Sequence, residues 1–419
     1  MATQPSGVGL AWPDLGGTNV AILSTPKRVM EAWHIGVIAA SALVAAMHGW
    51  VLTRWSRAWQ QATNASPCDE AGGAGDAGTN MAWSVVIPAR NEAPRLGHLL
   101  DDLAQQRGDF PVVVVDDHST DGTSDVARSH DLFLYGRLTV HSNRGKGKKS
   151  ALMSGLETTS TPWVVTLDAD VRLPRSWSQA WQRCLNQLDN HTACVAGPVA
   201  FASNPACPGL WEGVQALDYA AQMGWSAGCL AQGRPGSASG ANLAVKRATY
   251  PDTRHLGVSG DDTLVVQALQ REGHRVAWLA DARATVTTQG ATSVHEWVQQ
   301  RLRWAQKTVH YAPSAKRTAL WMACLSGTQW VLWILALKSG LAEPWMVAWI
   351  WWGLITLMHV MYARPVARWF GLKTSWKHTI LLGLAQPCHV PALLLSHLGM
   401  LRIMGIDSKP IWKGRTCDP

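Results

Sequence analysis

The sequence is poor in the features that identify several common classes of protein. Its eight cysteines are scattered and form no Cys-x-x-Cys pair, so we expect neither a zinc framework nor a disulfide scaffold, and a reduced cytosolic environment fits. Charged residues make up only 16% of the 419 residues, well below the usual quarter. Phe and Tyr are rare, with four and five copies, whereas Trp occurs 24 times. The length allows one large soluble domain plus smaller pieces.

The absence of charge is most pronounced in four long stretches. Each lacks acidic and basic residues for about 20 positions, the length of a helix that crosses the hydrocarbon core of a bilayer. They are Trp33–Leu52, Thr318–Leu337, Pro344–Tyr362 and Thr379–Leu401. A buried helix in a soluble protein is the alternative for any one stretch. The last three follow one another closely, and tryptophans cluster in Pro344–Tyr362 at Trp345, Trp349, Trp351 and Trp352, which favours membrane helices.

The net charge of +8 could indicate a nucleic-acid-binding protein, but the basic residues flank the apolar stretches instead. The flanking residues are Arg54, Arg57, Lys316, Arg317, Arg364, Arg368, Lys373 and Lys377. This positive-inside pattern predicts a multi-pass protein of the inner membrane, with these flanks and the middle of the chain in the cytoplasm. We expect anionic lipid headgroups, and no nucleic acid, as partners of this charge.

The last apolar stretch is irregular. Pro387 and Pro391 lie in its middle, where each would interrupt the helical hydrogen bonds. The tail that follows is basic, although simple counting of membrane spans would place it outside. We therefore predict a re-entrant or strongly kinked last segment with a cytoplasmic tail.

These patterns divide the chain into six parts. They are an N-terminal segment (1–30), a transmembrane helix (31–55), a flexible linker (56–82), a catalytic domain (83–312), a membrane helix cluster (313–405) and a basic tail (406–419). In the catalytic domain, short apolar strands alternate with helices. This order predicts an α/β fold with a mostly parallel mixed sheet and helices on both faces.

Asp168 and Asp170 form the most informative motif. They follow the apolar run Trp163–Leu167, which is typical of a buried parallel strand. The carboxyl end of such a strand is where open α/β sheets bind ligands. Two carboxylates there would offer oxygen ligands to Mg²⁺ or Mn²⁺. Acidic pairs also cap strands and turns, so the pair alone leaves both interpretations open.

Two other polar loops follow predicted strands and should lie at the same edge of the sheet. The first is 88–92 and the second is 116–123. A carboxylate at that edge can accept hydrogen bonds from a nucleotide base or a ribose. The position of Asp116 and Asp117 directly after a fully apolar strand favours this role for one of them. Asp121 is instead typical of a turn with a helix cap.

Three more segments have both a chemical and a structural interpretation. The loop 143–149 interleaves glycine and lysine before a helix, which suits a diphosphate, although a solvated basic loop is the alternative. Its spacing excludes a Walker A motif. Asp261 and Asp262 open an apolar helix, where acids also serve as caps. Residues 299–304 lie on a basic helix just before the membrane cluster, where a helix skirting the headgroups is the alternative.

In this order the motifs resemble those of membrane-anchored family 2 glycosyltransferases with the GT-A fold. Cellulose and hyaluronan synthases and bacterial lipid and carotenoid glycosyltransferases are similar. The resemblance covers about residues 83 to 310 and rests on P-x-R-N-E, V-V-D-D-H-S-x-D, G-K-x-x-A-L, D-A-D, G-x-N, G-D-D and Q-x-x-R-W. Met153 departs from the Asn often seen after Ala-Leu, and Asp261-Asp262 replaces the commoner Glu-Asp.

The resemblance implies roles for the matching residues. Those implied to bind the nucleotide sugar are Glu92, Asp116, Asp117, Lys148 and Asp168. Asp170, together with Asp168, would hold Mg²⁺ or Mn²⁺. Asp262 would be the general base, although Asp261 beside it leaves the assignment open. The acceptor or diphosphate side would be lined by Gln300, Arg303 and Trp304.

The implied reaction is inverting transfer of a sugar from a nucleoside-diphosphate sugar. A divalent ion and cationic side chains would neutralise the leaving diphosphate, and a base would take the proton of the acceptor hydroxyl. The apolar segments favour a membrane lipid as acceptor. A polysaccharide synthase of the same family and a catalytically inactive nucleotide-binding membrane scaffold are the alternatives. The tail Trp412–Arg415 also resembles a C-terminal motif of carotenoid-type glucosyltransferases in this family.

Overall fold

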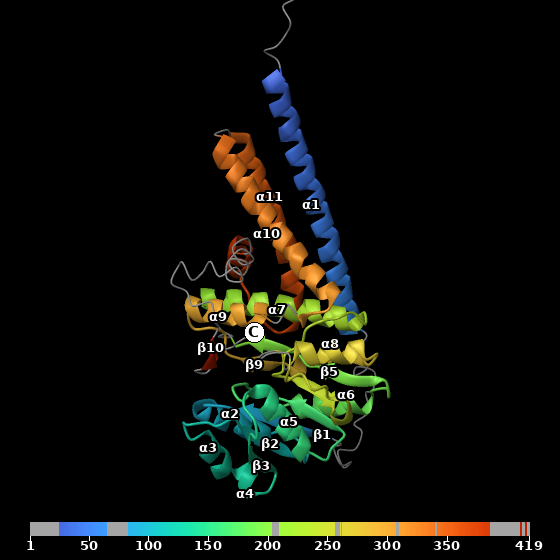
Figure 1. Ribbon diagram of the computed structural model, residues 1–419, viewed down its shortest axis with the longest axis vertical. Coiled ribbons are helices and arrows are strands. Elements are labelled where there is room, and N and C mark those ends of the chain that lie inside the picture. The colour runs from blue at the N-terminus through green and yellow to red at the C-terminus, as the bar shows by residue number, and fades with distance from the viewer. Residues whose placement is uncertain are drawn as a thin grey trace, which may run out of the picture. The chain divides into compact units, whose positions relative to one another are not determined.

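The computed structural model describes residues 25–64, 83–202, 209–255, 260, 262–306, 310–339, 342–385, 411–412 and 415–416 (Figure 1). The chain divides into two compact units, residues 1–43 and 44–419. In the first unit, the described residues belong to helix α1 (Thr25–Asn64), which continues into the second unit. The second unit contains the α/β sheet.

A seven-stranded sheet is the centre of the α/β part. Its strand order is β3-β2-β1-β4-β7-β5-β8, and among these strands β7 alone runs antiparallel to its neighbours. The strands are β1 (Trp83–Ala89), β2 (Val112–Asp116), β3 (Leu138–Ser142), β4 (Trp163–Thr166), β5 (Thr192–Ala196), β7 (Leu243–Lys246) and β8 (Arg275–Trp278). Two short strands, β6 (Val199–Phe201) and β9 (Val286–Thr288), pair separately in parallel. The predicted mostly parallel, mixed sheet is confirmed.

Helices cover both faces of this sheet because successive strand residues point to opposite sides. Val85 and Ile87 of β1 face a core that includes helix α2 (Ala93–Ala104), whereas Val86 between them faces helix α5 (Lys148–Thr158). Strands buried on both faces read as continuous apolar runs, which is why the sequence showed them. The other helices of this part are α3 (Thr123–Ser129), α4 (Asp131–Leu134), α6 (Trp177–Asn186), α7 (Leu210–Ala231), α8 (Thr263–Arg271) and α9 (Val294–Gln306).

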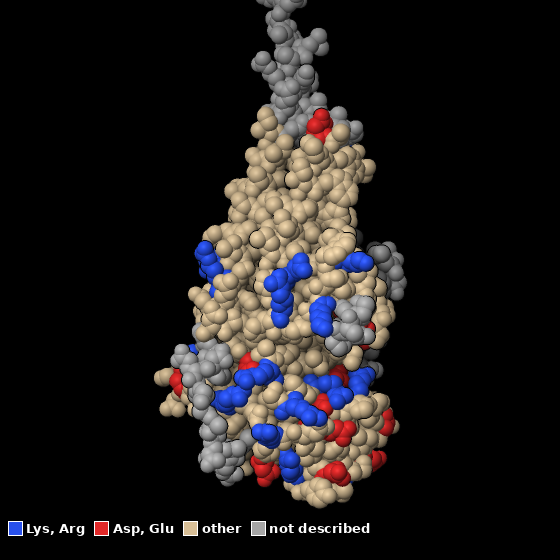
Figure 2. All heavy atoms as spheres, turned by 180° about the vertical axis from the view of Figure 1, so that it is seen from behind, with Lys and Arg blue, Asp and Glu red and all other residues tan. Residues whose placement is uncertain are grey.

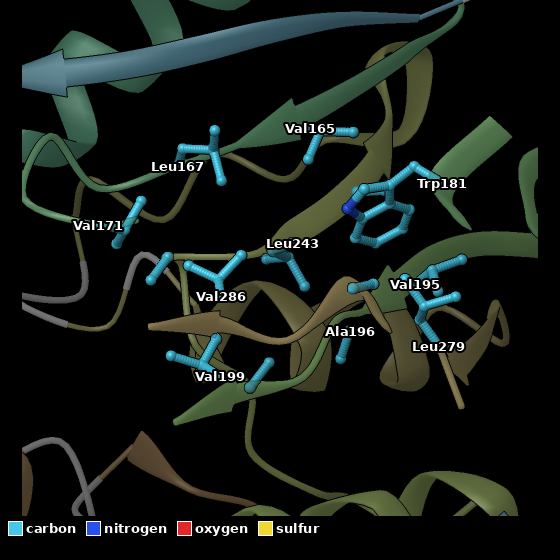
Figure 3. Close-up of a cluster of buried hydrophobic side chains, with 14 of the residues drawn as sticks. Val165, Leu167, Val171, Trp181, Val195, Ala196, Val199, Leu243, Leu279 and Val286 are labelled. Atoms are coloured by element: carbon cyan, nitrogen blue, oxygen red, sulfur yellow. The ribbon is translucent and has the colours of Figure 1, made fainter. Parts of the chain in front are cut away.

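The main core lies between β4, β5, β7 and helix α6. Val165, Val195 and Leu243 come from three neighbouring strands, and Trp181 of α6 packs beside them (Figure 3). Asn242, at the start of β7, is fully buried among these apolar groups. Its Oδ1 accepts hydrogen bonds from the indoles of Trp177 and Trp181, each at 3.0 Å, and its Nδ2 donates to two backbone carbonyls. The Asn of the G-x-N motif therefore joins helix α6 to the sheet.

Asp281 gives this core a pH-dependent contact. Burial acts to raise the pKa of its carboxyl, but hydrogen bonds from Arg283 and Arg183 outweigh burial and leave the pKa below its usual value. A carboxylate with a lowered pKa stabilises the fold at neutral pH, and this contribution is lost as the pH falls through the folded-state pKa. We expect Asp281→Asn to cost about 1–3 kcal/mol at pH 7. The gap in melting temperature between variant and wild type should close as the pH falls below the usual range of an Asp carboxyl, and a constant gap would contradict this account.

Among the described residues, three helices are long and apolar enough to cross a membrane. They are Ile35–Asn64 of α1, Pro313–Lys338 of α10 (Pro313–Ser339) and the whole of α11 (Ala342–Trp369). Their mean hydropathies are 1.9, 1.5 and 1.4, respectively. Large apolar side chains on them are exposed, among them Ile35, Trp50, Leu337 and Trp349. Figure 2 shows a broad stretch of surface with almost no acidic or basic side chain. Such surfaces are compatible with insertion into a bilayer.

The first apolar helix is longer than the sequence indicated. Helix α1 runs from Thr25 to Asn64, past both expected bounds of 31 and 55, so residues 56–64 of the expected linker are helical. The reason is tertiary packing. The ring of Trp59 lies against Trp369 and Phe370, with centroids 5.2 and 6.2 Å away, and Trp55 lies 5.9 Å from Tyr362. Residues 65–82 of the expected linker lie outside the described residues.

The fourth apolar stretch is described only in part. Residues 376–385 are helical, and the remainder to 401, with both prolines, lies outside the described residues. The re-entrant segment therefore stays a prediction. In the tail, β10 (Ile411–Trp412) and β11 (Arg415–Thr416) form an antiparallel pair.

Candidate active site

The polar loops predicted from the sequence meet at one edge of the sheet. Ala89 at the end of β1 pairs with Asp116 at the end of β2, which pairs with Ser142 at the end of β3. Strand β4 ends earlier, and the amide of Leu167 donates to the carbonyl of Val86 at 3.1 Å. Asp168 therefore follows β4 beside the end of β1. Parallel strands place these four loops together, as the sequence predicted.

The loops after β1 and β2 are joined by hydrogen bonds. Arg90 donates to the carbonyl of Asp117 at 2.6 Å, and Asn91 accepts from the amide of Thr120 at 2.9 Å. Asn91 and His118 adopt left-handed backbone conformations, with φ of 51° and 58°. Such conformations are disfavoured for residues with a side chain and cluster at functional sites. Here they lie in adjacent loops at the strand ends.

Asp117 shapes the glycine- and lysine-rich loop. Its side chain is buried, and Oδ1 accepts from Asn143 Nδ2 at 2.7 Å and from the amide of Gly147 at 3.0 Å. Asn143 in turn accepts from Gly145 and Ser150. Asp116 keeps a partly exposed carboxylate that accepts from the amide of Ser119 at 3.2 Å. The two acids thus differ, because Asp117 organises the loop while Asp116 is the more accessible to a nucleotide.

This difference predicts separate effects for the two acids. Asp117→Ala would remove the carboxylate that accepts from buried Asn143 and from the amide of Gly147, at a cost of about 2–4 kcal/mol, and would disorder the loop. Asp116→Ala should leave stability within about 0.5 kcal/mol. Thermal melting separates the variants, and calorimetry with UDP and GDP should show weaker nucleotide binding in both. A stable Asp117→Ala variant would contradict the structural role.

The loop delivers a lysine to the acids after β4. Lys148 Nζ lies 2.6 Å from Asp168 Oδ1, and these side chains are 19% and 33% exposed. A second cation, which sequence reasoning missed, is Arg95 on helix α2. Its guanidinium lies 3.4 Å from Glu92 and 3.5 Å from Asp170. The carboxyl of Glu92 is buried, so its place in the structure is beside Arg95 at the start of α2.

The pair Asp168 and Asp170 fits a divalent ion. Both carboxylates are partly exposed, and each has a cationic side chain beside it, Lys148 at Asp168 and Arg95 at Asp170, in a place that a metal cation could take. Within the described ranges, no group of three or more His, Cys, Asp or Glu could hold a metal ion. Two carboxylates suffice for Mg²⁺ or Mn²⁺ when substrate phosphates and water complete the coordination.

A bidentate ion pair between exposed Arg172 and buried Asp102 fixes the turn that carries Asp170. Arg172 donates to both oxygens of Asp102 on helix α2, at 2.6 and 2.8 Å, and the amide of Leu173 donates to the same carboxylate. The backbone of Arg172 also forms an antiparallel bridge with Thr287 of β9. The bidentate geometry defines the orientation of the segment immediately after Asp170.

Asp262 is the residue before helix α8. Its Oδ1 accepts from the amide of Thr263 at 2.5 Å, so it caps the helix, and its side chain is partly exposed. Helix α8 is attached to the segment that leads into β7, since Gln267 donates to Gly236 and Gln270 to Arg234. Asp261 lies outside the described residues.

The Q-x-x-R-W motif lies on helix α9. Arg301, between Gln300 and Arg303, forms a buried ion pair with Asp218 of helix α7. Its guanidinium lies over the rings of Trp297 and Trp304, at 5.3 and 4.6 Å from their centroids. Gln300 Oε1 is buried, with no hydrogen-bond partner among the described residues. The sequence did not reveal the Asp218–Arg301 pair.

Helix α7 also contacts an apolar helix. The hydroxyl of Tyr362 on α11 donates to the carbonyl of Ala221 at 3.1 Å. At Gly224 a Cβ would lie 2.7 Å from a methyl of Val366, so the absence of a side chain allows the close approach. One helix therefore touches both the Q-x-x-R-W helix and a helix that can cross a membrane.

A sheet of this order, with acids at the strand ends, is a GT-A-like fold. A mannosyltransferase from Pyrobaculum calidifontis, solved with GDP-Man and Mn²⁺, superposes with a TM-score of 0.51 over 85% of this chain and 98% of its own, at 20% identity. The likeness confirms the expected fold.

The chain belongs to glycosyltransferase family 2. The description "Glycosyl transferase family group 2" matches residues 163–398, more than half of the chain, and "Glycosyl transferase family 2" matches residues 84–223. A 4,4'-diaponeurosporenoate glycosyltransferase of Staphylococcus aureus (strain USA300) is 36% identical over 108 residues. That match covers 26% of this chain and only 28% of the relative.

Proposed function

We propose that this protein transfers a sugar, with inversion, from a nucleoside-diphosphate sugar to a hydroxyl of a membrane lipid. Membership of glycosyltransferase family 2 supports the reaction class. The lipid acceptor rests on a structural observation, namely that helix α7 lies between the Q-x-x-R-W helix and an apolar helix. Asp218 of α7 pairs with Arg301, while Ala221 and Gly224 contact α11.

The residues at the strand ends would bind the donor. Asp116 would accept hydrogen bonds from the base or ribose, with Asp117 holding the loop in shape and Glu92 positioning Arg95. Lys148 and Arg95, released from Asp168 and Asp170, would turn to the phosphates. An Mg²⁺ or Mn²⁺ ion held by Asp168 and Asp170 would supply charge neutralisation for the leaving diphosphate.

The proton of the acceptor would go to Asp262. The carboxylate of Asp262, at the start of α8, is partly exposed. One oxygen can keep the hydrogen bond from the amide of Thr263 while the other accepts the proton. As it loses its proton, the acceptor hydroxyl attacks the anomeric carbon from the face opposite the diphosphate. The glycosidic bond forms as the sugar–phosphate bond breaks, and the configuration of the anomeric carbon is inverted. Gln300, Arg303 and Trp304 would line the acceptor or diphosphate side.

Two further observations support the proposal, one for the lipid acceptor and one for contact with the cytoplasmic face of the membrane. The relative from Staphylococcus aureus is named for action on 4,4'-diaponeurosporenoate, a lipid-like molecule. Lys316 and Arg317 are exposed at the start of α10, where they would meet anionic headgroups at the inner rim of the bilayer.

Mass spectrometry of lipids from cells with and without the gene tests this proposal. We expect a lipid that is heavier by one sugar residue in cells with the gene and its unmodified form without it. A gene-dependent water-soluble polysaccharide, with an unchanged lipid profile, would contradict the lipid acceptor and favour a polymer synthase. A gene carrying Asp262→Asn is the matched control, since it should yield the unmodified lipid.

A further inference from the structure

Two histidines face each other between the apolar helices. His48 of α1 and His359 of α11 have ring centroids 4.9 Å apart, with an angle of 38° between the ring planes. His48 is fully buried. Neither residue belongs to the motifs that the sugar transfer uses. Ionisable side chains within membrane helices are rare and generally mark a functional site.

Most of the ring nitrogens of this pair lack a hydrogen-bond partner. Nδ1 of His359 lies 2.8 Å from the carbonyl oxygen of Ile355 and must donate to it, which leaves Nε2 as a lone-pair donor when the ring is neutral. This Nε2 and both nitrogens of His48 are buried and have no hydrogen-bond partner among the described residues. A buried polar group without a partner costs about 1–3 kcal/mol. A ligand bound to these nitrogens would remove that cost.

A sulfur ligand lies at the same helix crossing. The residue after His48 is Gly49, and a Cβ placed there would lie 3.7 Å from Sδ of Met358, the neighbour of His359. Around the pair, Ala45 and Leu52 are buried at the three- and four-residue spacing of a packed helix face. The crossing thus holds two imidazoles, and a thioether lies beside the residue that follows His48.

This donor set identifies the type of ligand. The nitrogens are closed to solvent, so they can enclose a single small species and not a lipid headgroup. Imidazole is a common copper ligand, and a thioether selects soft ions such as Cu⁺. Neutral ligands in an apolar surrounding favour a monovalent over a divalent ion, because burying uncompensated charge is costly.

We propose that His48 and His359, with Met358 as a third ligand, bind one Cu⁺ ion that joins α1 to α11. The arrangement of His359 matches that of ligating histidines, which commonly donate their other ring N–H to a carbonyl and so fix the ligating nitrogen. Two imidazoles that bind one metal at about 2 Å have ring centres about 5 Å apart, close to the separation in this pair. The proposal does not depend on the sugar-transfer reaction.

Copper retention tests the proposal. Full-length protein in detergent, purified through a tag without histidine, is incubated with Cu⁺ and ascorbate, passed through gel filtration and analysed for metal. Wild type should retain about one equivalent, and His48→Leu and His359→Asn below about a tenth of that. Asn at 359 can still donate to Ile355, so it removes the ligand and keeps the local hydrogen bond. The control is His378→Asn, because buried His378 accepts from Ser375 and lies outside the pair, and it should retain copper.

A thermal measurement protects the test against variants that fold poorly. Cu⁺ should raise the melting temperature of wild type and His378→Asn by several degrees and leave the two site variants unchanged. Equal copper content in wild type and His48→Leu would overturn the proposal and indicate a bridging water or a direct imidazole contact. Retention of Zn²⁺ in preference to Cu⁺ would overturn the assignment to a soft monovalent ion.

Discussion

Asp262→Asn should abolish sugar transfer while nucleotide-sugar binding stays at the wild-type level. A positioned general base contributes about 10²–10⁴-fold to the rate, and Asn cannot accept the acceptor's proton. The substitution is well suited to the question, because Asn is as good a helix cap as Asp and can keep the hydrogen bond from the amide of Thr263. Initial rates of transfer and calorimetric titration of the donor separate catalysis from binding.

Asp261→Asn is the matched control for this experiment. The two acids are adjacent in the sequence, and the family resemblance leaves room for either as base. Loss of transfer in Asp261→Asn, with full activity in Asp262→Asn, would reassign the base. Full activity in both variants would mean that the acceptor oxygen needs no base, as for an acceptor that is already a carboxylate.

Asp170→Asn should have the second large effect, on metal binding. Removing one of two carboxylate ligands is expected to weaken Mn²⁺ binding by about 10–100-fold and to slow transfer by a comparable or larger factor. Stability should change little, because Asp170 is partly exposed and its pair with Arg95, at 3.5 Å, is of the surface type. Titration of Mn²⁺ by electron paramagnetic resonance measures binding without any turnover.

Arg95→Ala provides a variant with the opposite expected effect on the same carboxylate. In the structure, the guanidinium of Arg95 lies between Glu92 and Asp170. Its removal leaves more negative charge for Mn²⁺, so metal binding in the absence of nucleotide should tighten by a few-fold. Mn²⁺ binding that is unchanged in both variants would show that Asp170 is not a metal ligand.

The parts of the fold that the sequence revealed are those whose pattern is local. Val112–Val115 and Val164–Val165 are buried on both faces of the sheet, so they appear as short apolar runs whatever their partners. The reversed direction of β7 was not predictable in this way, because strand direction depends on pairing with β4 and β5 across long stretches of chain.

The candidate site shows the same division. The position of each polar loop after a strand was sufficient to predict that 88–92, 116–123 and 168–170 share one edge. Which of Asp116 and Asp117 faces inward was left open, since alternation is lost once a strand ends. Arg95 and the Asp218–Arg301 pair were missed because their partners are distant in the sequence or on another element. For α1, counting apolar residues missed the last turns, which Trp55 and Trp59 hold by packing.

The most direct test of the account is transfer by the purified protein in lipid nanodiscs. The nanodiscs contain a lipid extract from cells that lack the gene, with radiolabelled UDP- and GDP-sugars and Mn²⁺. The account predicts Mn²⁺-dependent label in the organic phase, linked in the inverted anomeric configuration, and none with Asp262→Asn. Label that stays in the aqueous phase as a polymer, or a product of retained configuration, would contradict it.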